Sequence, residues 1–434
     1  MAMTYLRRCG IEIADHLRYN VALRELVARL RFERHRRRRP IDETDAVKTI
    51  ARLCVSARGA HDQSLLLTIE DEIRGRIATT DLSHVDWADI EPRFGKGQVN
   101  KGVILKPWIG PHERGVVFVS FEYQWLRLLR MRNLYEFAQR YALVLSPSWS
   151  PPHSVHLYAI AAQYPAPIFS LISNANDLRI IPRLSPKFVM VPLYASNWVH
   201  AELYSPVPYP RKDIDIVMLA NFGIYKRHLA LFRALRRLPR SLRVVLIGRA
   251  DSGRTRDTIM REAAAYGVAD RIEVRVGVSD EEVAQSLARS RISIILSKRE
   301  GSCVAVVESL FADTPVGVLD DAEIGSKVFI NSATGRLLKE KNLASELMDF
   351  LEHAAEYHPR QWALESKIDC YGSTEVLNRY IRDEMLASGQ EWTRDIAVHH
   401  WRPNPELLFP QDKESMHESC ADIEQRFGIA IGPV

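Results

Sequence analysis

Short apolar runs bounded by Gly, Pro and Ser alternate with helical patterns over most of this chain, in two series. The first series has apolar runs at residues 101–108, 114–121, 141–149, 166–173 and 188–196. The second has them at residues 213–221, 242–249, 271–277, 291–297 and 314–319. Strands and helices in alternation predict parallel sheets with helices on both faces. The sequence therefore predicts an α/β protein with two doubly wound sheets.

A Pro-rich stretch, "YSPVPYPRK" at residues 204–212, separates the two series and is the best candidate for a linker. A chain of 434 residues is also too long for one ordinary core. The predicted parts are a helical basic extension, a first Rossmann-like domain, a second Rossmann-like domain and a helical tail, at residues 1–95, 96–208, 209–357 and 358–434.

Composition narrows the class of protein. Hydrophobic residues make up 46% and charged residues 26% of the chain, which is typical of a globular protein in water. No apolar run reaches the roughly 18 residues of a membrane span, and the N-terminus shows no secretion signal. Five scattered cysteines without a CxxC pair favour reduced thiols and argue against a zinc site. These features predict a cytoplasmic protein.

Positive charge is concentrated near the N-terminus. Residues 1–40 contain eleven Arg and four Asp or Glu, a net charge of +7. Just before the densest Arg run, one helical face is apolar, with Leu23, Leu26, Val27 and Leu30. Three interpretations remain, in order of preference: a helix packed on its own protein with an exposed Arg tail, peripheral contact with the cytoplasmic face of an anionic membrane, and contact with nucleic acid.

The segment "SKREGSCVAVVESLFADTP", residues 297–315, carries the strongest functional pattern. A strand ends there and a helix begins, and ligands bind at the carboxyl ends of strands in such sheets. The backbone amides of Ser302, Cys303 and Val304 would form an anion site at the helix start, suited to a diphosphate. Glu300 and Glu308 flank that site, and a carboxylate can accept both hydrogen bonds of a ribose diol.

Residues from about 213 to 356 resemble the donor-binding domain of family 4 retaining glycosyltransferases of the GT-B fold. "EGSCVAVVE" resembles the family's two Glu separated by seven residues, "ESLFADTPVGV" its following helix and strand, and "NSATGRLL" its Thr-Gly turn. The resemblance covers roughly a third of the chain. It implies two Rossmann-like doubly wound domains facing a cleft, the second binding the donor, preceded here by the N-terminal helical extension.

The same resemblance implies a function. A sugar would pass from a UDP- or GDP-sugar donor to an acceptor hydroxyl with retention of configuration, without a cofactor or an obligatory metal. The acceptor would be an unknown glycan, a lipid-linked molecule or a small molecule. Two alternatives stay open: a catalytically weak relative that binds a glycan or a partner protein, and a nucleotide-sugar epimerase.

Functional residues follow from the resemblance. Glu300 would stabilise charge near the anomeric carbon, and Lys226 would neutralise the leaving diphosphate. The residues expected to bind the donor are Glu308, Gly301, Ser302, Cys303, Val304, Asn221, Arg227, Arg249, Val276 and Gly277. Acceptor contacts are expected at Trp149 and His153.

Two positions depart from the family's pattern. Asn221 stands where the family usually has an Arg, and an amide cannot supply the missing positive charge. Arg227, Arg249 and Arg299 are the candidates to replace it. Lys327 stands where the family usually has an acidic residue.

Overall fold

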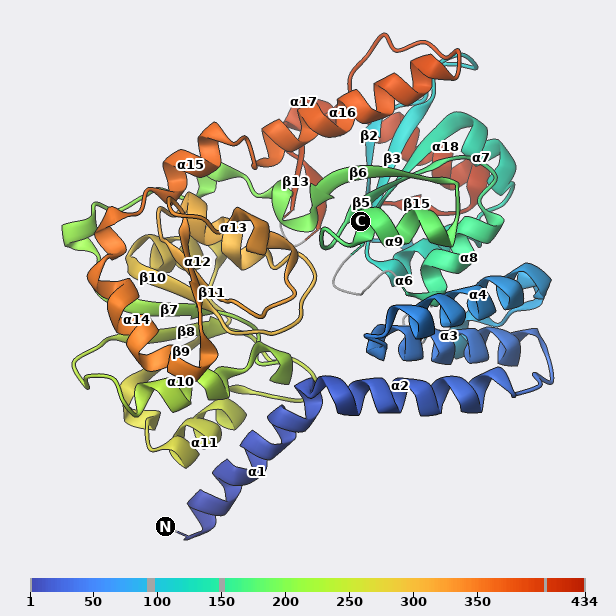
Figure 1. Ribbon diagram of the computed structural model, residues 1–434. Helices are drawn as coiled ribbons and strands as arrows, with labels where there is room; N and C mark the ends of the chain where they lie inside the picture. Colours follow the sequence, from blue (N-terminus) through green and yellow to red (C-terminus); the bar gives the residue numbers. More distant parts are fainter. Residues whose placement is uncertain (1, 92–97, 148–152, 402–403, 433–434) are drawn as a thin grey trace. The chain divides into compact units, whose positions relative to one another are not determined.

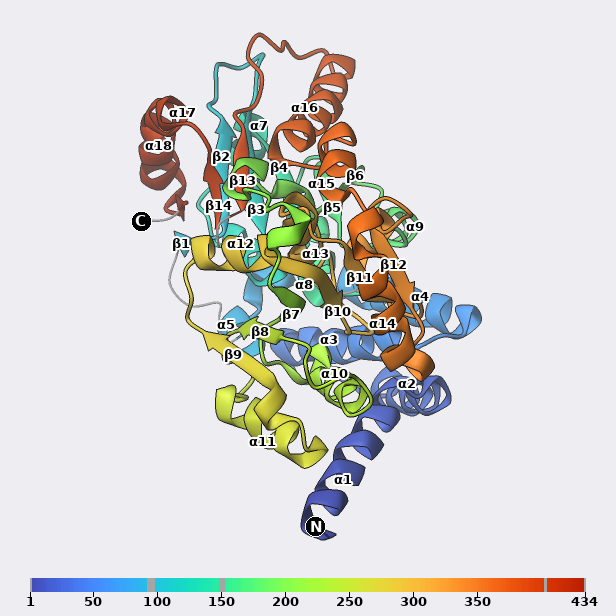
Figure 2. The same cartoon turned by 90° about the vertical axis from the view of Figure 1, so that its left-hand side faces the viewer.

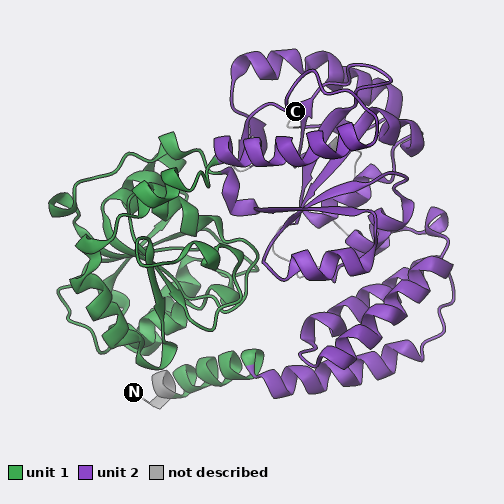
Figure 3. Cartoon of the chain, turned by 45° about the horizontal axis from the view of Figure 1, so that its top comes forward, with its two compact units in different colours: residues 1–19, 199–369 green, residues 20–198, 370–434 purple. Residues whose placement is uncertain are grey.

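The computed structural model describes residues 2–91, 98–147, 153–401 and 404–432. It divides the chain into two compact units (Figure 3). Unit 1 contains residues 1–19 and 199–369, and unit 2 contains residues 20–198 and 370–434. Each unit is built around a β-sheet covered by helices, as the α/β prediction requires (Figure 1).

The sheet of unit 1 is entirely parallel, with the strand order β12-β11-β10-β7-β8-β9. Its strands are β7 (Ile214–Leu219), β8 (Val244–Gly248), β9 (Ile272–Val276), β10 (Ser290–Ile295), β11 (Val316–Leu319) and β12 (Gly335–Leu338). The first five coincide with the predicted apolar runs, because Val and Ile pack well on a sheet buried on both faces. The strand order changes direction between β7 and β10, so the carboxyl ends of these two strands form the switch point.

Helices connect the strands of unit 1. They are α10 (His228–Leu235), α11 (Arg256–Tyr266), α12 (Asp280–Ala288) and α13 (Val304–Phe311), and the last strand, β12, is followed by α14 (Leu343–Glu352) and α15 (Pro359–Glu365). Short 3-10 turns include η6 (Ile224–Lys226), η8 (Gly325–Phe329) and η9 (Glu340–Asn342). At the start of β12, Gly335 has φ 156° and a Cβ there would lie 2.0 Å from the Val316 carbonyl oxygen. Only glycine allows that close approach of β12 to β11.

The N-terminal helix α1 (Ala2–Tyr19) belongs to unit 1. It lies alongside α11 in both views of the chain (Figures 1 and 2). Helix α2 (Val21–Arg36) starts immediately after it, because the Asn20 side chain accepts a hydrogen bond from the Leu23 amide at 2.9 Å. The predicted extension, residues 1–95, is therefore helical but divided between the two units at Asn20.

The predicted linker is anchored within unit 1. The ammonium of Lys212 donates to the carbonyl oxygens of Ala288, Ser290 and Asp313 at 2.9–3.1 Å. Tyr204 is buried as well. The chain passes from unit 2 to unit 1 after residue 198, before this Pro-rich stretch.

The main sheet of unit 2 has the order β2-β3-β4-β5-β6. Its strands are β2 (Gly102–Lys106), β3 (Gly115–Ser120), β4 (Tyr141–Ser146), β5 (Ile168–Ile172) and β6 (Phe188–Tyr194). All neighbours are parallel except β2 and β3. Residues 107–114 alone connect that pair, which is too short for a helical crossover, so the two strands run antiparallel. The helices that connect the other strands are α6 (Glu122–Leu128), α7 (Leu134–Arg140), α8 (Val155–Gln163) and α9 (Asp177–Leu184).

A helical region precedes this sheet in unit 2. It contains α2, α3 (Glu43–Gly59), α4 (Gln63–Thr79) and α5 (Trp87–Ile90), and α3 and α4 pack against α8. The last part of unit 2 contains α16 (Cys370–Ala387), β13 (His399–Trp401), β14 (Pro405–Leu407), α17 (Pro410–Ser415), α18 (His417–Phe427) and β15 (Ala430–Ile431). Strand β15 pairs with β1 (Gln98–Val99). The tail predicted as helical thus also contains strands, and its first residues, 358–369, belong to unit 1.

The apolar face predicted on α2 is exposed. Leu26 is 53% and Leu30 is 63% exposed, whereas Ala28 and Phe32 are buried. Helix α2 packs on its own protein, as the preferred interpretation expects, but it contacts α3 through the face with Ala28 and Phe32 and not through the predicted leucines. Among the described residues, no helix is both long and apolar enough to span a membrane.

Candidate functional site

The structure brings Lys226 and Glu300 together at the switch point of unit 1. Lys226 ends η6 after strand β7, and Glu300 follows β10 in the loop before α13. The Lys226 Nζ lies 2.5 Å from the Glu300 Oε2, and the two side chains are only 12% and 8% exposed. The two residues predicted to carry the chemistry thus form a nearly buried ion pair at the edge where ligands bind in such sheets.

The electrostatics of this pair favour its charged form. Burial alone would lower the pKa of Lys226, but the Glu300 carboxylate beside the ammonium outweighs burial and raises it. The Ser297 hydroxyl donates to the other oxygen of Glu300, Oε1. Glu300 is therefore held at both oxygens, and Lys226 stays positively charged near the start of α13.

The start of α13 has the geometry of an anion site. The amides of Gly325 and Ser326 donate to the carbonyl oxygens of Gly301 and Ser302 at 2.7 and 3.1 Å, and the Ser326 hydroxyl donates to that of Cys303 at 3.1 Å. In a trans peptide, the carbonyl oxygen of one residue and the N–H of the next residue point in opposite directions. The N–H groups of residues 302–304 therefore point away from η8, at the positive end of the helix dipole.

Cys303 is the residue before α13 and adopts a left-handed conformation with φ 51°. Burial raises the pKa of its thiol. Since only a thiolate is a good nucleophile, Cys303 contributes its backbone rather than its sulfur to this site.

Glu308 lies on α13 about a turn after the anion site. The Tyr204 hydroxyl donates to its Oε1 at 3.1 Å. Burial raises the pKa of Glu308 to about 7, and the Tyr204 hydrogen bond offsets only part of that effect. Glu308 therefore changes its charge near neutral pH, and a ligand that donates hydrogen bonds to the carboxylate favours the charged form.

The other predicted donor residues occupy the loops after β7, β8 and β9. The Asn221 amide group donates to the Tyr225 hydroxyl at 3.0 Å, so Asn221 shapes the loop that carries Lys226. Arg249, Val276 and Gly277 are exposed at the carboxyl ends of β8 and β9. Gly277 has φ 68° and nothing lies within 4 Å of where its Cβ would be, so its backbone is open to a ligand.

Arg227 has partners other than a diphosphate. Its guanidinium is buried and donates to Asp15 of α1 and to Glu340 of η9, with shortest distances of 2.6 and 2.7 Å. Arg299 is also paired with a carboxylate, since its Nε lies 2.8 Å from the Glu323 Oε2. Of the three arginines considered as replacements at Asn221, Arg227 and Arg299 are thus held by carboxylates.

Sequence patterns did not indicate Asp15, Tyr19 or Glu340 as neighbours of the site. Asp15 and Arg227 are separated by 212 positions in the chain. A motif that spans a few neighbouring residues does not indicate which distant residue will pair with them. Lys327, at the family's usual acidic position, donates to the carbonyl oxygens of Asp320 and Ala322.

The two predicted acceptor residues belong to unit 2. Trp149 lies outside the described residues. His153 is buried, its Nε2 lies 2.7 Å from the Glu70 Oε1 of α4, and Arg183 donates to the same oxygen at 2.8 Å. Its ring therefore ties the loop before α8 to the helical region.

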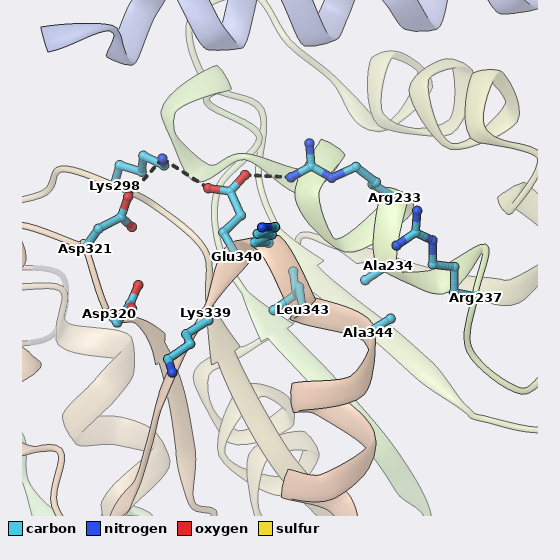
Figure 4. A pocket seen from close by; sticks show the side chains of 11 residues that line it. Arg233, Ala234, Arg237, Lys298, Asp320, Asp321, Lys339, Glu340, Leu343 and Ala344 are labelled. Atoms are coloured by element: carbon cyan, nitrogen blue, oxygen red, sulfur yellow. Dashed lines mark hydrogen bonds and ion pairs between the residues drawn. The ribbon is translucent and has the colours of Figure 1, made fainter.

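A cavity of about 710 Å³ in unit 1 lies elsewhere, over the carboxyl ends of β10, β11 and β12 between α10 and α14 (Figure 4). It is lined by Arg233, Ala234, Arg237, Lys298, Asp320, Asp321, Lys339, Glu340, Lys341, Leu343 and Ala344. Glu300, Glu308 and Lys226 do not line it. The cavity adjoins the ion pairs of Glu340 rather than the predicted donor site.

Part of this chain matches a known protein family. Residues 205–363 match the model of a family described as "Glycosyl transferases group 1". A GDP-mannose:cellobiosyl-diphosphopolyprenol alpha-mannosyltransferase of Komagataeibacter xylinus is 26% identical over 167 residues, which are 38% of this chain and 41% of that protein. This chain therefore matches only about two fifths of the length of that relative.

Among solved structures, sucrose-phosphate synthase from Thermosynechococcus elongatus is similar, with a TM-score of 0.50 and 15% identity. The similarity covers 63% of this chain and 74% of that one. The predicted fold is confirmed: the chain has the GT-B glycosyltransferase fold, and its residues 205–363 match the group 1 glycosyl transferase family.

Proposed function

We propose that this protein is a retaining hexosyltransferase, which moves a sugar from a nucleotide-diphosphate donor to an acceptor hydroxyl. The observation that carries the proposal is the Lys226–Glu300 ion pair of 2.5 Å at the switch point, beside the start of α13. The family match over residues 205–363 supports a nucleotide sugar as donor.

In the proposed reaction, the donor diphosphate binds at the amides of residues 302–304 and the ribose hydroxyls bind Glu308. The bond between the anomeric carbon and the diphosphate oxygen breaks, and the acceptor oxygen bonds to the same face of that carbon. The acceptor proton passes to the leaving phosphate. Lys226 meets the negative charge that grows on the leaving group, and Glu300 stabilises the positive charge near the anomeric carbon. No metal ion or cofactor takes part in these steps.

A second cation for the diphosphate is proposed at Arg249. Asn221 cannot supply charge, and carboxylates hold Arg227 and Arg299. Arg249 is exposed at the end of β8, the strand beside β7. Backbone contacts at Val276 and Gly277, at the end of the next strand, complete the proposed nucleotide site.

The nucleotide can be identified by thermal unfolding with GDP, UDP and ADP and with their hexose derivatives, because a ligand of the native state raises its apparent stability. GDP compounds are expected to give the larger shift, since the mannosyltransferase relative is named for GDP-mannose. Donor hydrolysis is then measured for the best ligand, and the anomer transferred to a sugar acceptor is identified by NMR. An inverted product would contradict retention.

Two outcomes would favour other functions. Binding of nucleotide sugars without any turnover would favour a weakly active protein that binds a glycan or a partner. Release or conversion of a donor sugar with one changed stereocentre would favour an epimerase. A lack of any stabilisation by these nucleotides would remove the proposed donor site.

Peripheral contact with an anionic membrane is proposed for α2, as a route to a lipid-linked acceptor. The exposed Leu26 and Leu30 follow one side of α2, and exposed arginines follow them along the chain. Apolar side chains insert at the headgroup boundary, and each basic residue near an anionic surface contributes about 1 kcal/mol. Salt screens that attraction.

Replacing Leu26 and Leu30 together with serine is expected to reduce co-sedimentation with phosphatidylglycerol vesicles at least tenfold. Burying the two leucines would contribute about 1.5–3 kcal/mol each. Leu67→Ser is the matched control, because Leu67 is an exposed leucine of α4 in the same unit. Equal losses in both variants, or salt-sensitive binding of RNA in place of vesicles, would contradict the proposal.

A further inference from the structure

Helix α1 contacts the loop that carries Lys226. Its Asp15 carboxylate accepts three hydrogen bonds from the Arg227 guanidinium: from Nε to Oδ1 at 3.0 Å and to Oδ2 at 3.2 Å, and from Nη2 to Oδ2 at 2.6 Å. Arg227 directly follows Lys226, and its side chain is 1% exposed. A bidentate pair of this kind fixes both the position and the orientation of the guanidinium.

The same helix also contacts the loop that carries Glu300. The Tyr19 ring at the end of α1 lies 5.4 Å from the Arg227 Cζ and 6.0 Å from the Lys298 Nζ. Both cations are within the range of a cation–π interaction. Lys298 precedes Glu300 by two residues, so one short stretch of α1 contacts both loops that supply the ion pair.

The contacts of α1 belong to a balanced set of buried or half-buried charges. Glu340 accepts hydrogen bonds from Arg227 and Arg233 at 2.7 and 2.6 Å and lies 3.1 Å from Lys298. Lys298 also lies 3.0 Å from Asp321 (Figure 4). Three cations thus face three carboxylates, one of which is Asp15. Neutralising Asp15 would leave the Arg227 guanidinium buried with excess positive charge.

Backbone conformation connects this set to Lys226. Arg227 adopts a left-handed conformation, φ 55° and ψ 45°, between η6 and α10. Such a conformation is unfavourable for a bulky residue and persists only where its surroundings enforce it. The anchored guanidinium provides that enforcement on one side of the turn. On the other side, the Lys226 ammonium reaches Glu300 at 2.5 Å.

We propose that Asp15 and Tyr19 of α1 are positioning residues, which hold the loops after β7 and β10 so that Lys226 and Glu300 meet. The N-terminal helix is then part of the donor-binding unit and not a separable extension. The catalytic consequence of this inference rests on the proposed function, whereas the geometric consequence does not.

The test compares Asp15→Asn with the unchanged protein by two readouts. The first is the rate at which an amine-reactive acetylating reagent modifies Lys226, followed by peptide mass spectrometry. We expect Asp15→Asn to raise that rate several-fold, because the ammonium is released from Glu300. The second readout is donor hydrolysis, where kcat is expected to fall about 10- to 100-fold with KM within about twofold, as for a misplaced catalytic group. For Asp15→Glu, the labelling rate of Lys226 and the kcat are expected to lie between those of Asp15→Asn and the unchanged protein.

Glu12→Gln is the matched control. Glu12 lies on the same helix and helps to raise the pKa of the Tyr266 hydroxyl on α11, an effect due first to burial. A role of α1 in docking alone would affect both variants equally, so equal labelling and equal kcat in the two would overturn the proposal. If Asp15→Asn does not fold, Tyr19→Ala replaces it, and unchanged Lys226 labelling there overturns the proposal as well.

The two readouts separate this inference from the proposed function. Faster Lys226 labelling in a protein that turns over no nucleotide sugar would support the positioning role and contradict the transferase. Normal turnover of nucleotide sugars, with Lys226 labelling and kcat both unaffected by Asp15→Asn, would support the transferase and contradict the positioning role.

Discussion

Replacing Lys226 with alanine is expected to lower kcat for donor turnover about 10²–10³-fold, with a small change in KM. The diphosphate gains negative charge as the glycosidic bond breaks, so the ammonium contributes most in the transition state. Removal of one such preorganised charge or donor typically has an effect of this size. Steady-state kinetics of donor hydrolysis measure both parameters.

The matched control for this variant is Lys341→Ala, because Lys341 is an exposed lysine of the same unit in η9. Thermal unfolding of both variants reports any loss of stability, since Lys226→Ala leaves Glu300 without its ion-pair partner. If kcat is unchanged and only KM rises, Lys226 binds the ground and transition states equally. Another cation, with Arg249 as the first candidate, would then serve the leaving group.

Replacing Glu308 with alanine is expected to weaken nucleoside diphosphate binding by about 1.5–3 kcal/mol, or roughly 10- to 150-fold, with a smaller effect on folding. The reason is the loss of a charged acceptor for the ribose hydroxyls beside the α13 anion site. Isothermal titration of both forms gives the two affinities. Glu352→Ala, on an exposed position of α14, is the control. Equal affinity in the Glu308 variant and the unchanged protein would exclude Glu308 from the site.

The pH dependence of binding gives an independent prediction. Because burial raises the pKa of Glu308 to about 7, a ligand that prefers the carboxylate should bind more tightly as the pH rises from about 6 to 8. The terminal phosphate of a nucleoside diphosphate titrates near pH 6 and also makes binding depend on pH. The difference between the profiles of the unchanged protein and Glu308→Gln therefore gives the part that is due to Glu308. The variant is expected to flatten the profile between pH 6.5 and 8. An identical profile in both forms would contradict a direct contact.

The same raised pKa makes the stability of the free protein fall as the pH rises, whereas ligand binding becomes tighter. The folded protein holds a proton on Glu308 more tightly than the unfolded chain does. The contribution to stability is therefore complete below the unfolded pKa, near 4.5, and is lost as the pH rises through about 7. The ligand thus binds best where this residue destabilises the free protein most.

Local sequence patterns predicted what depends on neighbouring residues. The apolar runs predicted the strands of both main sheets except β12, because its sequence "GRLL" begins with Gly and Arg and has only two apolar residues. The loop and helix around Glu300 were predicted from their order in the chain, whereas the ion pair between Glu300 and Lys226 was not predicted.

Features that depend on distant residues were not predicted. Nothing in residues 2–19 indicates that Asp15 would meet Arg227, because the pair forms only when the two segments fold together. The burial of His399 in the polar tail was not predicted either. Its ring is buried against that of Trp198, with the two ring centroids 4.1 Å apart. Side-chain character along a segment does not determine which distant surface will cover it.

The discontinuity of unit 1 has a consequence during synthesis on the ribosome. Helix α1 leaves the ribosome before the rest of unit 1, and Arg227 follows 212 positions after Asp15. At about 5–20 residues per second the helix therefore waits about 10–40 s for its binding surface. Over that interval Ile11 and Tyr19, which are half-buried in the folded unit, are open to chaperones or to another nascent chain. A recombinant form of unit 1 that begins at residue 199 would lack the helix permanently. Joining residues 2–19 to it through a flexible linker would restore the complete folding unit.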